Sequence, residues 1–171
     1  MSMQTIHGVY LADTARVVGE VALGVDVNLW YGAVIRGDVA PVTVGAGSNV
    51  QDQAVIHCDA GRANTIGAAV TIGHGAIVHG VFVGDGAMIG MGARLLGGTR
   101  VEPGSIVAAG ALLPEGMVVP EGMVAMGIPA RIARPLTDRE KQYLLDIPPR
   151  YIEYARLHCA GKDPRVRPWG R

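Results

Sequence analysis

The stretch VGDGAMIGMGARLLGGTRVEPGSIVAAGALLPEGMVV, residues 83–119, has an aliphatic residue at every sixth position. A period of six fits neither an α-helix, which repeats about every 3.6 residues, nor a two-sided β-hairpin. It fits a triangular coil in which short strands alternate with corners and two side chains in every hexad point inward. Three hexads complete one turn, and neighbouring coils fill a narrow core. This stretch therefore predicts a parallel β-helix.

The same six-residue register, meaning the series of aliphatic positions that open each hexad, continues on both sides of this stretch through most of the chain. Its positions before the quoted stretch are Leu11, Val17, Leu23, Leu29, Ile35, Val44, Val50, Ile56, Ile66, Ile72 and Val78, and after it the register ends at Ala125. Two insertions interrupt it, because Ile35 and Val44 are nine positions apart instead of six, and Ile56 and Ile66 are ten apart. Insertions in a solenoid form loops on one side. We therefore expect a loop at each insertion.

The composition narrows the class of protein and of partner. The 171 residues include 25 Gly but only 1 Phe, and 49% are hydrophobic, so the apolar content is mainly small and β-branched, as narrow β-structure requires. Lys+Arg and Asp+Glu number 15 each. This balance gives no reason to expect nucleic acid or an anionic membrane as a partner. We expect a small or neutral ligand.

The sequence also predicts a cytoplasmic protein that does not enter a membrane. Cys58 and Cys159 are too few for a disulfide framework, and the beginning MSMQTIHGVY has no feature of a signal peptide. No window approaches the roughly 18 uninterrupted apolar residues that would span a bilayer.

The chain divides into three predicted parts. Residues 1–135 form the β-helix domain, residues 136–161 a C-terminal helical segment packed on it, and residues 162–171 a basic tail, KDPRVRPWGR, to which we assign no function. Between the first two parts, the sequence MGIPARIARPL contains Pro129 and Pro135 and predicts an extended turn.

The helical segment opens with a predicted capping box. Thr137 is followed three residues later by Glu140, a spacing in which each side chain can bond the backbone of the other. The pair Pro148–Pro149 predicts an interruption of the helix. A second helix would follow and stop at Gly161.

Three of the five histidines lie among Gly, Ala, Val and Ile, in NVQDQAVIH (49–57) and VTIGHGAIVHG (70–80). Arg36, His57 and His79 each follow a register position by one residue, three hexads apart once the insertions are discounted. They should form one column on one face. Adjacent coils lie about 4.8 Å apart, so two stacked imidazoles can converge on one metal ion with bonds of about 2.0–2.1 Å.

His74 follows its register position by two residues and so belongs to the preceding face, in the column of Tyr31 and Asp52. Asp52 could accept a hydrogen bond from His74 and orient its ring. Because His74 faces another direction, a three-histidine site needs His74 of a neighbouring chain. Prisms packed around a three-fold axis supply that neighbour three times. We predict a homotrimer with three intersubunit sites, each formed by His57 and His79 of one chain and His74 of the next.

Four motifs resemble those of the γ-class carbonic anhydrases and occur in the order of that family. They are VIRGD (34–38), SNVQD (48–52), VIH ending at His57, and IGHGAIVHG (72–80). The resemblance covers roughly residues 8–135. It implies the left-handed β-helix that hexapeptide-repeat proteins share.

The resemblance also implies roles for single residues. It assigns His57, His74 and His79 as ligands of Zn2+, or of Fe2+ or Co2+, with Arg36, Asp38, Asn49 and Gln51 around them. Arg36 and Asp38 would take part in an intersubunit ion pair, and Gln51 would contact the water on the metal. Asp59 is the only carboxylate near the first ligand, so we include it among the catalytic candidates.

The ligand set predicts a metal-dependent carbonic anhydrase. Three neutral imidazoles leave the ion its full charge and an open position for water, whose pKa can fall from 15.7 to about 7, an effect for which carbonic anhydrase is the reference case. The metal-bound hydroxide would attack CO2 to give bicarbonate in a reversible reaction. A proton must then leave the site.

Two alternative functions stay open. The chain lacks the acidic loop that serves proton transfer in the best-characterised branch, because Val-Ala-Pro follows the VIRGD motif. A metal-binding homologue with an assembly or carrier role and little or no turnover is therefore one alternative. The other is a hexapeptide-type acyl-CoA transferase or thioesterase, although such an enzyme needs only one histidine.

Several residues also have purely structural interpretations. Arg36 and Asp38 fit a salt bridge of a trimer as well as a catalytic role. We expect Cys58 to be a small packing residue rather than a thiolate near the metal. Tyr151 and Tyr154 on the terminal helix are expected to pack in the core or an interface, the alternative being that they line a neighbour's site.

Overall fold

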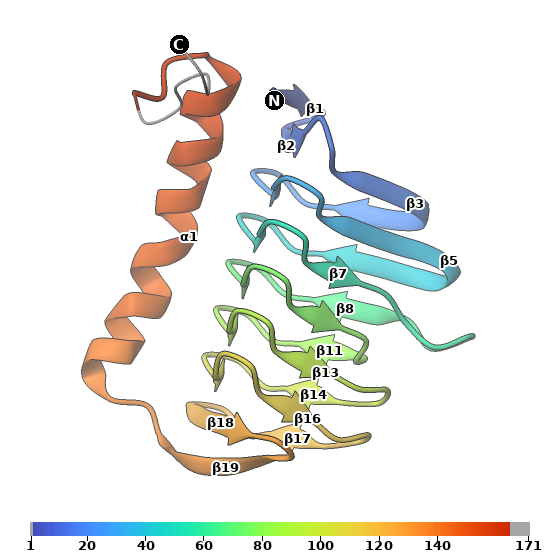
Figure 1. Cartoon of the computed structure of the whole chain (residues 1–171), viewed down its shortest axis with the longest axis vertical. Helices are drawn as coiled ribbons and strands as arrows, with labels where there is room; N and C mark the ends of the chain where they lie inside the picture. The colour runs from blue at the N-terminus through green and yellow to red at the C-terminus, as the bar shows by residue number, and fades with distance from the viewer. Residues whose placement is uncertain (1, 165–171) are drawn as a thin grey trace.

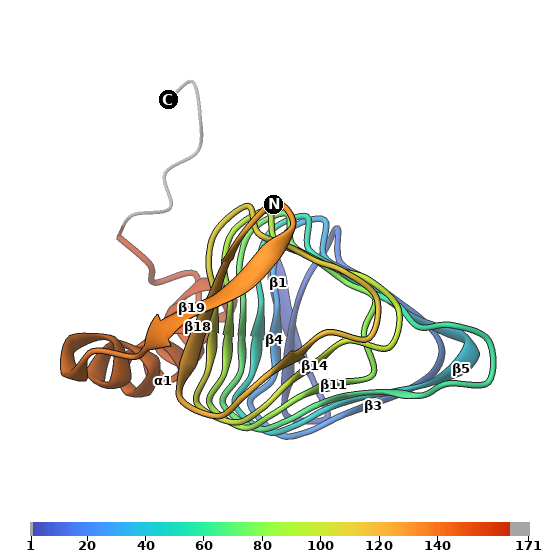
Figure 2. The same ribbon diagram turned by 90° about the horizontal axis from the view of Figure 1, so that it is seen from below.

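The computed structural model describes residues 2–164 and is a prism of stacked coils with one long helix along its side (Figure 1). Seen along the axis, the coils superimpose as a triangle (Figure 2). The elements are β1 (Met3–Ile6), β2 (Val9–Ala12), β3 (Arg16–Leu23), β4 (Asn28–Leu29), β5 (Val34–Val44), β6 (Asn49–Val50), β7 (Val55–Ile56), β8 (Asn64–Ile66), β9 (Thr71–Ile72), β10 (Ile77–Val78), β11 (Phe82–Val83), β12 (Met88–Ile89), β13 (Arg94–Leu95), β14 (Arg100–Val101), β15 (Ile106–Val107), β16 (Leu112–Leu113), β17 (Val118–Val119), β18 (Met123–Gly127), β19 (Ala130–Pro135) and α1 (Asp138–Cys159).

The strands of successive coils pair in parallel, which confirms the predicted parallel β-helix. One face is the run β2-β4-β6-β9-β12-β15-β18. The other two faces join through β5, with β7, β10, β13 and β16 on one side of it and β8, β11, β14 and β17 on the other. Register positions lie opposite one another, as where Leu29 pairs with Val50 and Val50 with Ile72.

The core consists of the register side chains. Leu29, Ile35, Ile56 and Ile72 are each 0% exposed. Burying such an aliphatic side chain contributes roughly 1.5–3 kcal/mol relative to leaving it in water. Because each coil supplies only a few of them, the core of one coil is completed by the coils above and below.

The first insertion does not form a loop, so that prediction is wrong. The chain continues through it as the strand β5, which pairs with β3 on both sides of a single register shift. Extended pairing satisfies backbone hydrogen-bonding groups that a loop would leave to solvent. The two strands pass so closely at Gly19 and Gly37 that a Cβ on either would overlap the neighbouring backbone. The glycine of VIRGD is therefore a packing requirement.

The second insertion is a loop, as predicted. Residues 57–63 contain no strand. The loop returns to β5, where the Gly61 amide donates to the Val39 carbonyl oxygen over 3.2 Å. Both insertions project from the same corner of the triangle, at the end marked β5 in Figure 2.

Antiparallel strands close the two ends of the solenoid. β1 pairs with β2 at one end, and β18 pairs with β19 at the other. The predicted extended turn at MGIPARIARPL is thus a β-hairpin. Pro129 lies in its two-residue connection after a cis peptide bond, and Pro135 ends β19. The prolines were read correctly as boundaries, but the residues between them find strand partners in β18.

The terminal helix is one continuous element, so the predicted interruption at Pro148–Pro149 is wrong. Each proline removes one backbone donor, but the fixed φ of about −65° is compatible with a helix. Leu144, Ile147 and Pro148 are buried against the coils. This burial holds the helix together across the proline pair, as tertiary packing often overrides propensity.

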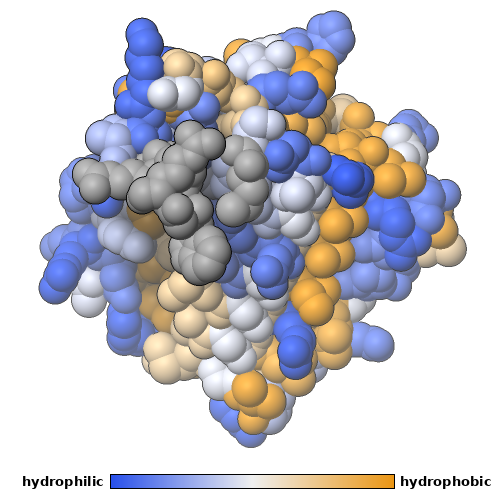
Figure 3. All heavy atoms as spheres, turned by 45° about the horizontal axis from the view of Figure 1, so that its top comes forward, coloured by the Kyte–Doolittle hydropathy of each residue, from blue (hydrophilic) through white to orange (hydrophobic). Residues whose placement is uncertain are grey.

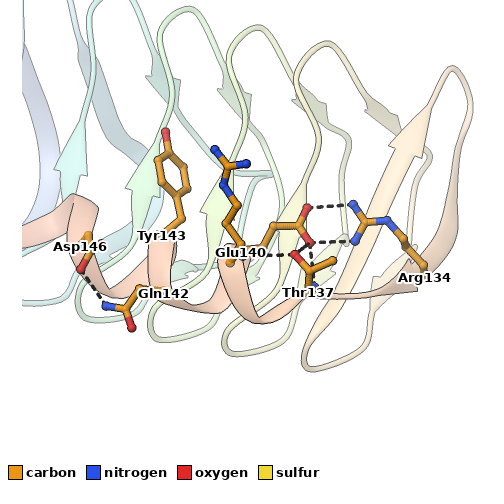
Figure 4. A pocket seen from close by; sticks show the side chains of 7 residues that line it. Arg134, Thr137, Glu140, Gln142, Tyr143 and Asp146 are labelled. Atoms are coloured by element: carbon orange, nitrogen blue, oxygen red, sulfur yellow. Dashed lines mark hydrogen bonds and ion pairs between the residues drawn. The ribbon is translucent and has the colours of Figure 1, made fainter.

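The capping box at the start of the helix is confirmed. The Glu140 amide donates to Thr137 Oγ1 over 3.3 Å, and the Thr137 amide donates to Glu140 Oε2 over 2.8 Å. Arg134 of β19 donates to both Glu140 oxygens, each over 2.8 Å (Figure 4). Hydrogen bonds from the Arg134 guanidinium first, and then from the Thr137 amide and hydroxyl, lower the pKa of Glu140 to about 2. The carboxylate therefore joins the last strand to the helix.

The molecular surface mixes polar and apolar side chains. Figure 3 shows a hydrophobic band running down one visible face between hydrophilic side chains. Val18, Val39 and Ile77 are among the exposed large apolar residues, at 49%, 43% and 39% exposure. Within the described residues, no helix is long and apolar enough to cross a membrane. Most of the predicted basic tail, residues 165–171, lies outside the described residues.

Candidate metal centre

His57 and His79 lie side by side on neighbouring coils. β5, β7 and β10 pair so that Ile35 faces Ile56 and Ile56 faces Val78. The residues that follow them, Arg36, His57 and His79, form the predicted column. The ring centroids of His57 and His79 are 5.3 Å apart, and the ring planes are inclined by 37°.

Carboxylates contact both rings. Asp38 Oδ1 lies 3.1 Å from His57 Nε2, while Asp38 Oδ2 accepts a hydrogen bond from Arg36. The Arg36 guanidinium, followed by the His57 ring, holds the pKa of Asp38 below its ordinary value. Asp59 Oδ1 lies 3.5 Å from His79 Nδ1. Within this chain Arg36 and Asp38 pair with each other; their intersubunit ion pair stays a prediction.

The loop after His57 places its side chains in two directions. Asp59 turns toward His79, and its Oδ2 also lies 4.0 Å from the Arg62 guanidinium. Cys58 turns inward, is 1% exposed and donates to the Ala40 carbonyl oxygen over 3.3 Å. Burial raises the pKa of this thiol. A buried thiol of raised pKa is a poor nucleophile and a poor ligand, which agrees with a packing role.

Asn64 is a residue that the sequence analysis missed. It is 0% exposed, and its Nδ2 donates to the His57 carbonyl oxygen over 2.9 Å and to the Val78 carbonyl oxygen over 3.3 Å. One side chain therefore joins the backbones on which both neighbouring histidines stand. Its Oδ1 is buried without a partner among the described residues. The only sequence signal was an amide immediately before a register strand.

His74 stands on a different edge of the prism, beside Asp52. His74 Nδ1 lies 2.8 Å from Asp52 Oδ2, as the register predicts. Glycines flank the histidine: a Cβ at Gly73 would approach the Met91 amide nitrogen to 2.7 Å, and Gly75 has a φ of +65°. Other residues are strained in that conformation. The sequence GHG therefore describes a tight corner that presents the ring, whose side chain is 46% exposed.

Gln51 and Asn49 lie on the His74 side of the chain. Gln51 Nε2 donates to Asn49 Oδ1 over 3.0 Å, and Asn49 Nδ2 donates to Thr71 Oγ1 over 2.9 Å. Gln51 and His74 border the same small cavity of about 170 Å3. Inside one chain Gln51 thus accompanies His74 and not the pair of His57 and His79.

The terminal helix covers part of the His74 edge. Tyr151 packs edge-on against Trp30, with ring centroids 5.5 Å apart, and Tyr151 and Tyr154 are 5.8 Å apart. Burial is the first cause of the raised pKa of Tyr151. Both tyrosines line a cavity with His74 of their own chain. They therefore combine packing with a place beside one candidate ligand.

The histidines of one chain do not complete a metal site among the described residues. Within residues 2–164, no group of three His, Cys, Asp or Glu side chains is placed to hold a metal ion. His74 and His79 turn Nδ1 toward carboxylates, which leaves the lone pair of Nε2 in each ring available to bind a metal ion. In His57 the carboxylate faces Nε2 instead. A metal bound through that nitrogen would displace Asp38, which Arg36 already holds.

Comparison with known proteins places this architecture in a class. A solved structure of a hexapeptide transferase family protein from Anaplasma phagocytophilum is 36% identical and matches 91% of this chain and 96% of its own, with a TM-score of 0.77. A putative acetyltransferase from Bacillus cereus is 31% identical, matches 92% of this chain and 91% of its own, and has a TM-score of 0.86. The fold is therefore that of the left-handed β-helix, hexapeptide-repeat proteins.

Curated relatives make the relationship more specific. A probable carbonic anhydrase of Methanocaldococcus jannaschii is 46% identical over 59 residues, which are 34% of this chain and 37% of that protein. The matched segments span 18% to 37% of the first curated relatives' own lengths. No protein-family model matches the chain. The chain belongs to the hexapeptide-repeat proteins, and over these segments it is similar to γ-class carbonic anhydrases.

Proposed function

We propose that this protein is a metal-dependent carbonic anhydrase that hydrates CO2 reversibly at three-histidine sites between the subunits of a homotrimer. His57 and His79 of one chain and His74 of the next would hold a divalent ion, with Zn2+ as the first choice and Fe2+ or Co2+ as alternatives. When bound, such an ion supplies a Lewis acid that activates water near neutral pH.

The observation that carries the proposal is the placement of the three histidines. Two rings stand 5.3 Å apart on adjacent coils, and the third stands on another edge with its Nδ1 on Asp52. Three histidines on a scaffold of small residues have no shared structural task inside one chain. A second copy of the chain gives them one.

Exposed apolar residues beside the His57–His79 pair support a subunit contact there. Val18 is the register partner of Arg36, Val39 follows Asp38, and Ile77 lies on β10 before His79. Large apolar side chains that cluster at the surface mark association sites. The polar rings would then be enclosed by an apolar rim when the trimer forms.

The other residues of the site have distinct proposed tasks. The Gln51 amide, held by Asn49, would orient the nucleophile or the product by hydrogen bonding. Asp52 keeps the proton of His74 on Nδ1 and so leaves Nε2 available for the ion. Arg36 neutralises Asp38, and Asp59 is the carboxylate within reach of His79.

Metal analysis of the anaerobically purified protein, followed by stopped-flow CO2 hydration on zinc-, cobalt- and iron-loaded samples, tests the proposal. We expect one divalent ion per chain, a trimer in sedimentation, and hydration by at least one loaded form. Failure of every sample to bind metal contradicts the central claim. Stoichiometric metal without hydration would instead favour an assembly or carrier role.

An acyl-CoA transferase is the second candidate function. The Bacillus cereus structure that this chain resembles over most of its length is described as a putative acetyltransferase. That reaction would use one histidine as a base and would need no metal. Turnover of acetyl-CoA or another acyl-CoA by metal-free protein would favour it over CO2 hydration.

A further inference from the structure

A second histidine–aspartate pair lies at the end of the terminal helix. His158 Nδ1 is 3.0 Å from Asp163 Oδ2. The histidine side chain is 13% exposed and the aspartate side chain only 1%. The metal-site residues described above do not include this pair. Burying a carboxylate costs free energy unless a partner such as this imidazole pairs with it.

The contacts of His158 determine which nitrogen is basic. Nδ1 also lies 2.9 Å from the Tyr154 carbonyl oxygen. A carbonyl oxygen and a carboxylate oxygen are both acceptors, so Nδ1 must carry hydrogen. In the neutral ring, Nε2 therefore has the free lone pair and is the atom that can accept a proton.

The ring is also held in place. Its centroid is 5.1 Å from that of Trp30, with the planes at 80°, and 6.5 Å from that of Tyr31. Aromatic neighbours on one side and hydrogen-bond acceptors on the other restrict rotation of His158. A fixed tautomer and a fixed ring are what proton transfer requires of a donor–acceptor group.

His158 shares a cavity with the candidate metal ligand on its own chain. The pairs His74–Asp52 and His158–Asp163 line one cavity of about 290 Å3, together with Trp30, Tyr151 and Tyr154. Water occupies about 30 Å3 per molecule in the liquid, so a cavity of this volume has room for several water molecules between the two pairs. His158 and Asp163 also line a second cavity of about 330 Å3, which includes Ser2 and Cys159.

The proposed reaction requires a proton acceptor of this kind. Hydration of CO2 by water yields one bicarbonate and one proton. Among residues 2–164, Asp38 and Asp59 are the carboxylates in contact with the His57–His79 pair, and Asp59 already contacts His79 and Arg62. Imidazole is the side chain whose ordinary titration lies closest to neutral pH.

We propose that His158 is the proton-transfer residue of the metal site, and that Asp163 positions it. The inference rests on the proposed carbonic anhydrase function. The proton released during hydration passes through the cavity shared with His74 to His158 Nε2. Nδ1 keeps its own hydrogen, which remains bonded to the ring and faces Asp163. Buffer then removes the proton from the side of the second cavity, which restores the neutral ring.

The environment of His158 is consistent with this cycle. Among the described residues, the titratable groups that contact His158 or line its cavities are Asp163, Tyr31, Cys159, Tyr151, Tyr154, Asp52 and His74. Burial first, then Asp13, Asp52 and Cys159, raise the pKa of Tyr31. That phenol therefore stays neutral at working pH and does not compete for the proton.

Comparison of His158→Gln with a matched control, His7→Gln, tests the proposal. Gln keeps a polar side chain of similar reach but cannot titrate, and His7 lies in the turn between β1 and β2. In dilute buffer we expect kcat of His158→Gln to fall on the order of 10- to 100-fold. The value of kcat/KM should change less than about twofold, because proton release follows hydration. Concentrated imidazole should restore kcat, and His7→Gln should match wild type.

A second set of measurements does not depend on turnover. Metal content of His158→Gln should equal that of wild type, because the residue is not a ligand. Its melting temperature should fall, because the buried Asp163 carboxylate loses its contact with the ring. In metal-free protein, the 15N chemical shifts of the His158 ring should show hydrogen on Nδ1 in wild type. The population of the Nε2–H tautomer should rise in Asp163→Asn, since the carboxylate acceptor of the Nδ1 hydrogen is gone.

The outcomes separate this inference from the proposed function. An unchanged kcat of His158→Gln in dilute buffer overturns the inference, as does an equal fall of kcat and kcat/KM. An unchanged tautomer population in Asp163→Asn overturns it as well, even if no sample turns over. Absence of hydration in wild type, with the expected change of tautomer, refutes the function and with it the relay.

Discussion

The coils of residues 35–80 and those of residues 83–119 have the same fold but different interiors. The buried polar residues of the first group are Ser48, Asn49, Gln51, Asn64 and Thr71, whereas the second has Thr99 and Ser105. Both insertions and all three candidate ligands also lie in the first group. Regular coils are held mainly by aliphatic stacking. The histidine-bearing coils add side-chain hydrogen bonds, which are directional and can position a ring where stacking alone cannot.

The largest effect should come from removing the ligand that stands apart. His74→Ala should abolish CO2 hydration, by more than about 100-fold, because loss of a mere hydrogen-bond partner of a ligand already costs about 10- to 100-fold. The trimer should survive, since the ring is exposed and its loss leaves the coil intact. Stopped-flow assays and sedimentation measure the two quantities.

His7→Ala is the control for that experiment, because His7 lies outside the histidine-bearing coils. It should keep wild-type hydration. Retention of full metal content and activity by His74→Ala would show that the first group of coils does not need the third histidine.

Equal core truncations in the two groups should have equal effects on stability and unequal effects on metal binding. Ile56→Ala and Leu113→Ala each remove a fully buried side chain and should cost about 2–5 kcal/mol of unfolding free energy. Only Ile56→Ala should also weaken metal binding, because His57 is the next residue. Denaturant unfolding and metal titration check both statements. Equal loss of metal affinity in Leu113→Ala would mean that the coils are not locally independent.

A smaller effect should follow from the buried amide. Asn64→Ala removes the donor to the His57 carbonyl oxygen and should cost about 1–3 kcal/mol, although it also removes an unpaired Oδ1. The matched change Ser105→Ala removes donations to the Pro103 and Pro120 carbonyl oxygens in the regular coils. Metal affinity should fall in the first variant alone. A fall in both, measured by titration calorimetry, would assign Asn64 no positioning role.

The smallest effect concerns acid stability at the junction of β19 and α1, outside both groups. The folded pKa of Glu140 is about 2 against an ordinary value of 4.5. Its stabilisation is therefore complete above pH 4.5 and is lost as the pH falls toward 2. The difference in melting temperature between wild type and Glu140→Gln should shrink over that interval. A difference that stays constant from pH 6 to pH 2 would contradict the role of the Arg134–Glu140 contact.

Much of the candidate site could be predicted because a repeat converts position into direction. Residues one position after a register position form one column, and residues two positions after it form another. This rule separated His57 and His79 from His74. The Asp52–His74 contact followed from the same rule. Asn64 could not be found in this way, because the insertion before it breaks the count and its task depends on two carbonyl groups from different coils.

Other errors arose where partners distant in sequence decide. β5 is extended because β3 lies beside it, and nothing in the insertion itself signals that pairing. The helix crosses Pro148–Pro149 because Ile147 and Pro148 find a surface to pack on. Local propensity does not include such contacts. In both places the tertiary contacts, and not the propensity, determined the secondary structure.

The sequence by itself determined the parallel coil, the columns and the separation of one histidine from two, because the period of six sets the direction of each side chain. Only the tertiary structure decided which nitrogen of each ring is free, since that depends on the carboxylate placed against it. It also brought His158 from the far end of the chain into a cavity with His74. Helix packing, and not spacing along the chain, creates that proximity.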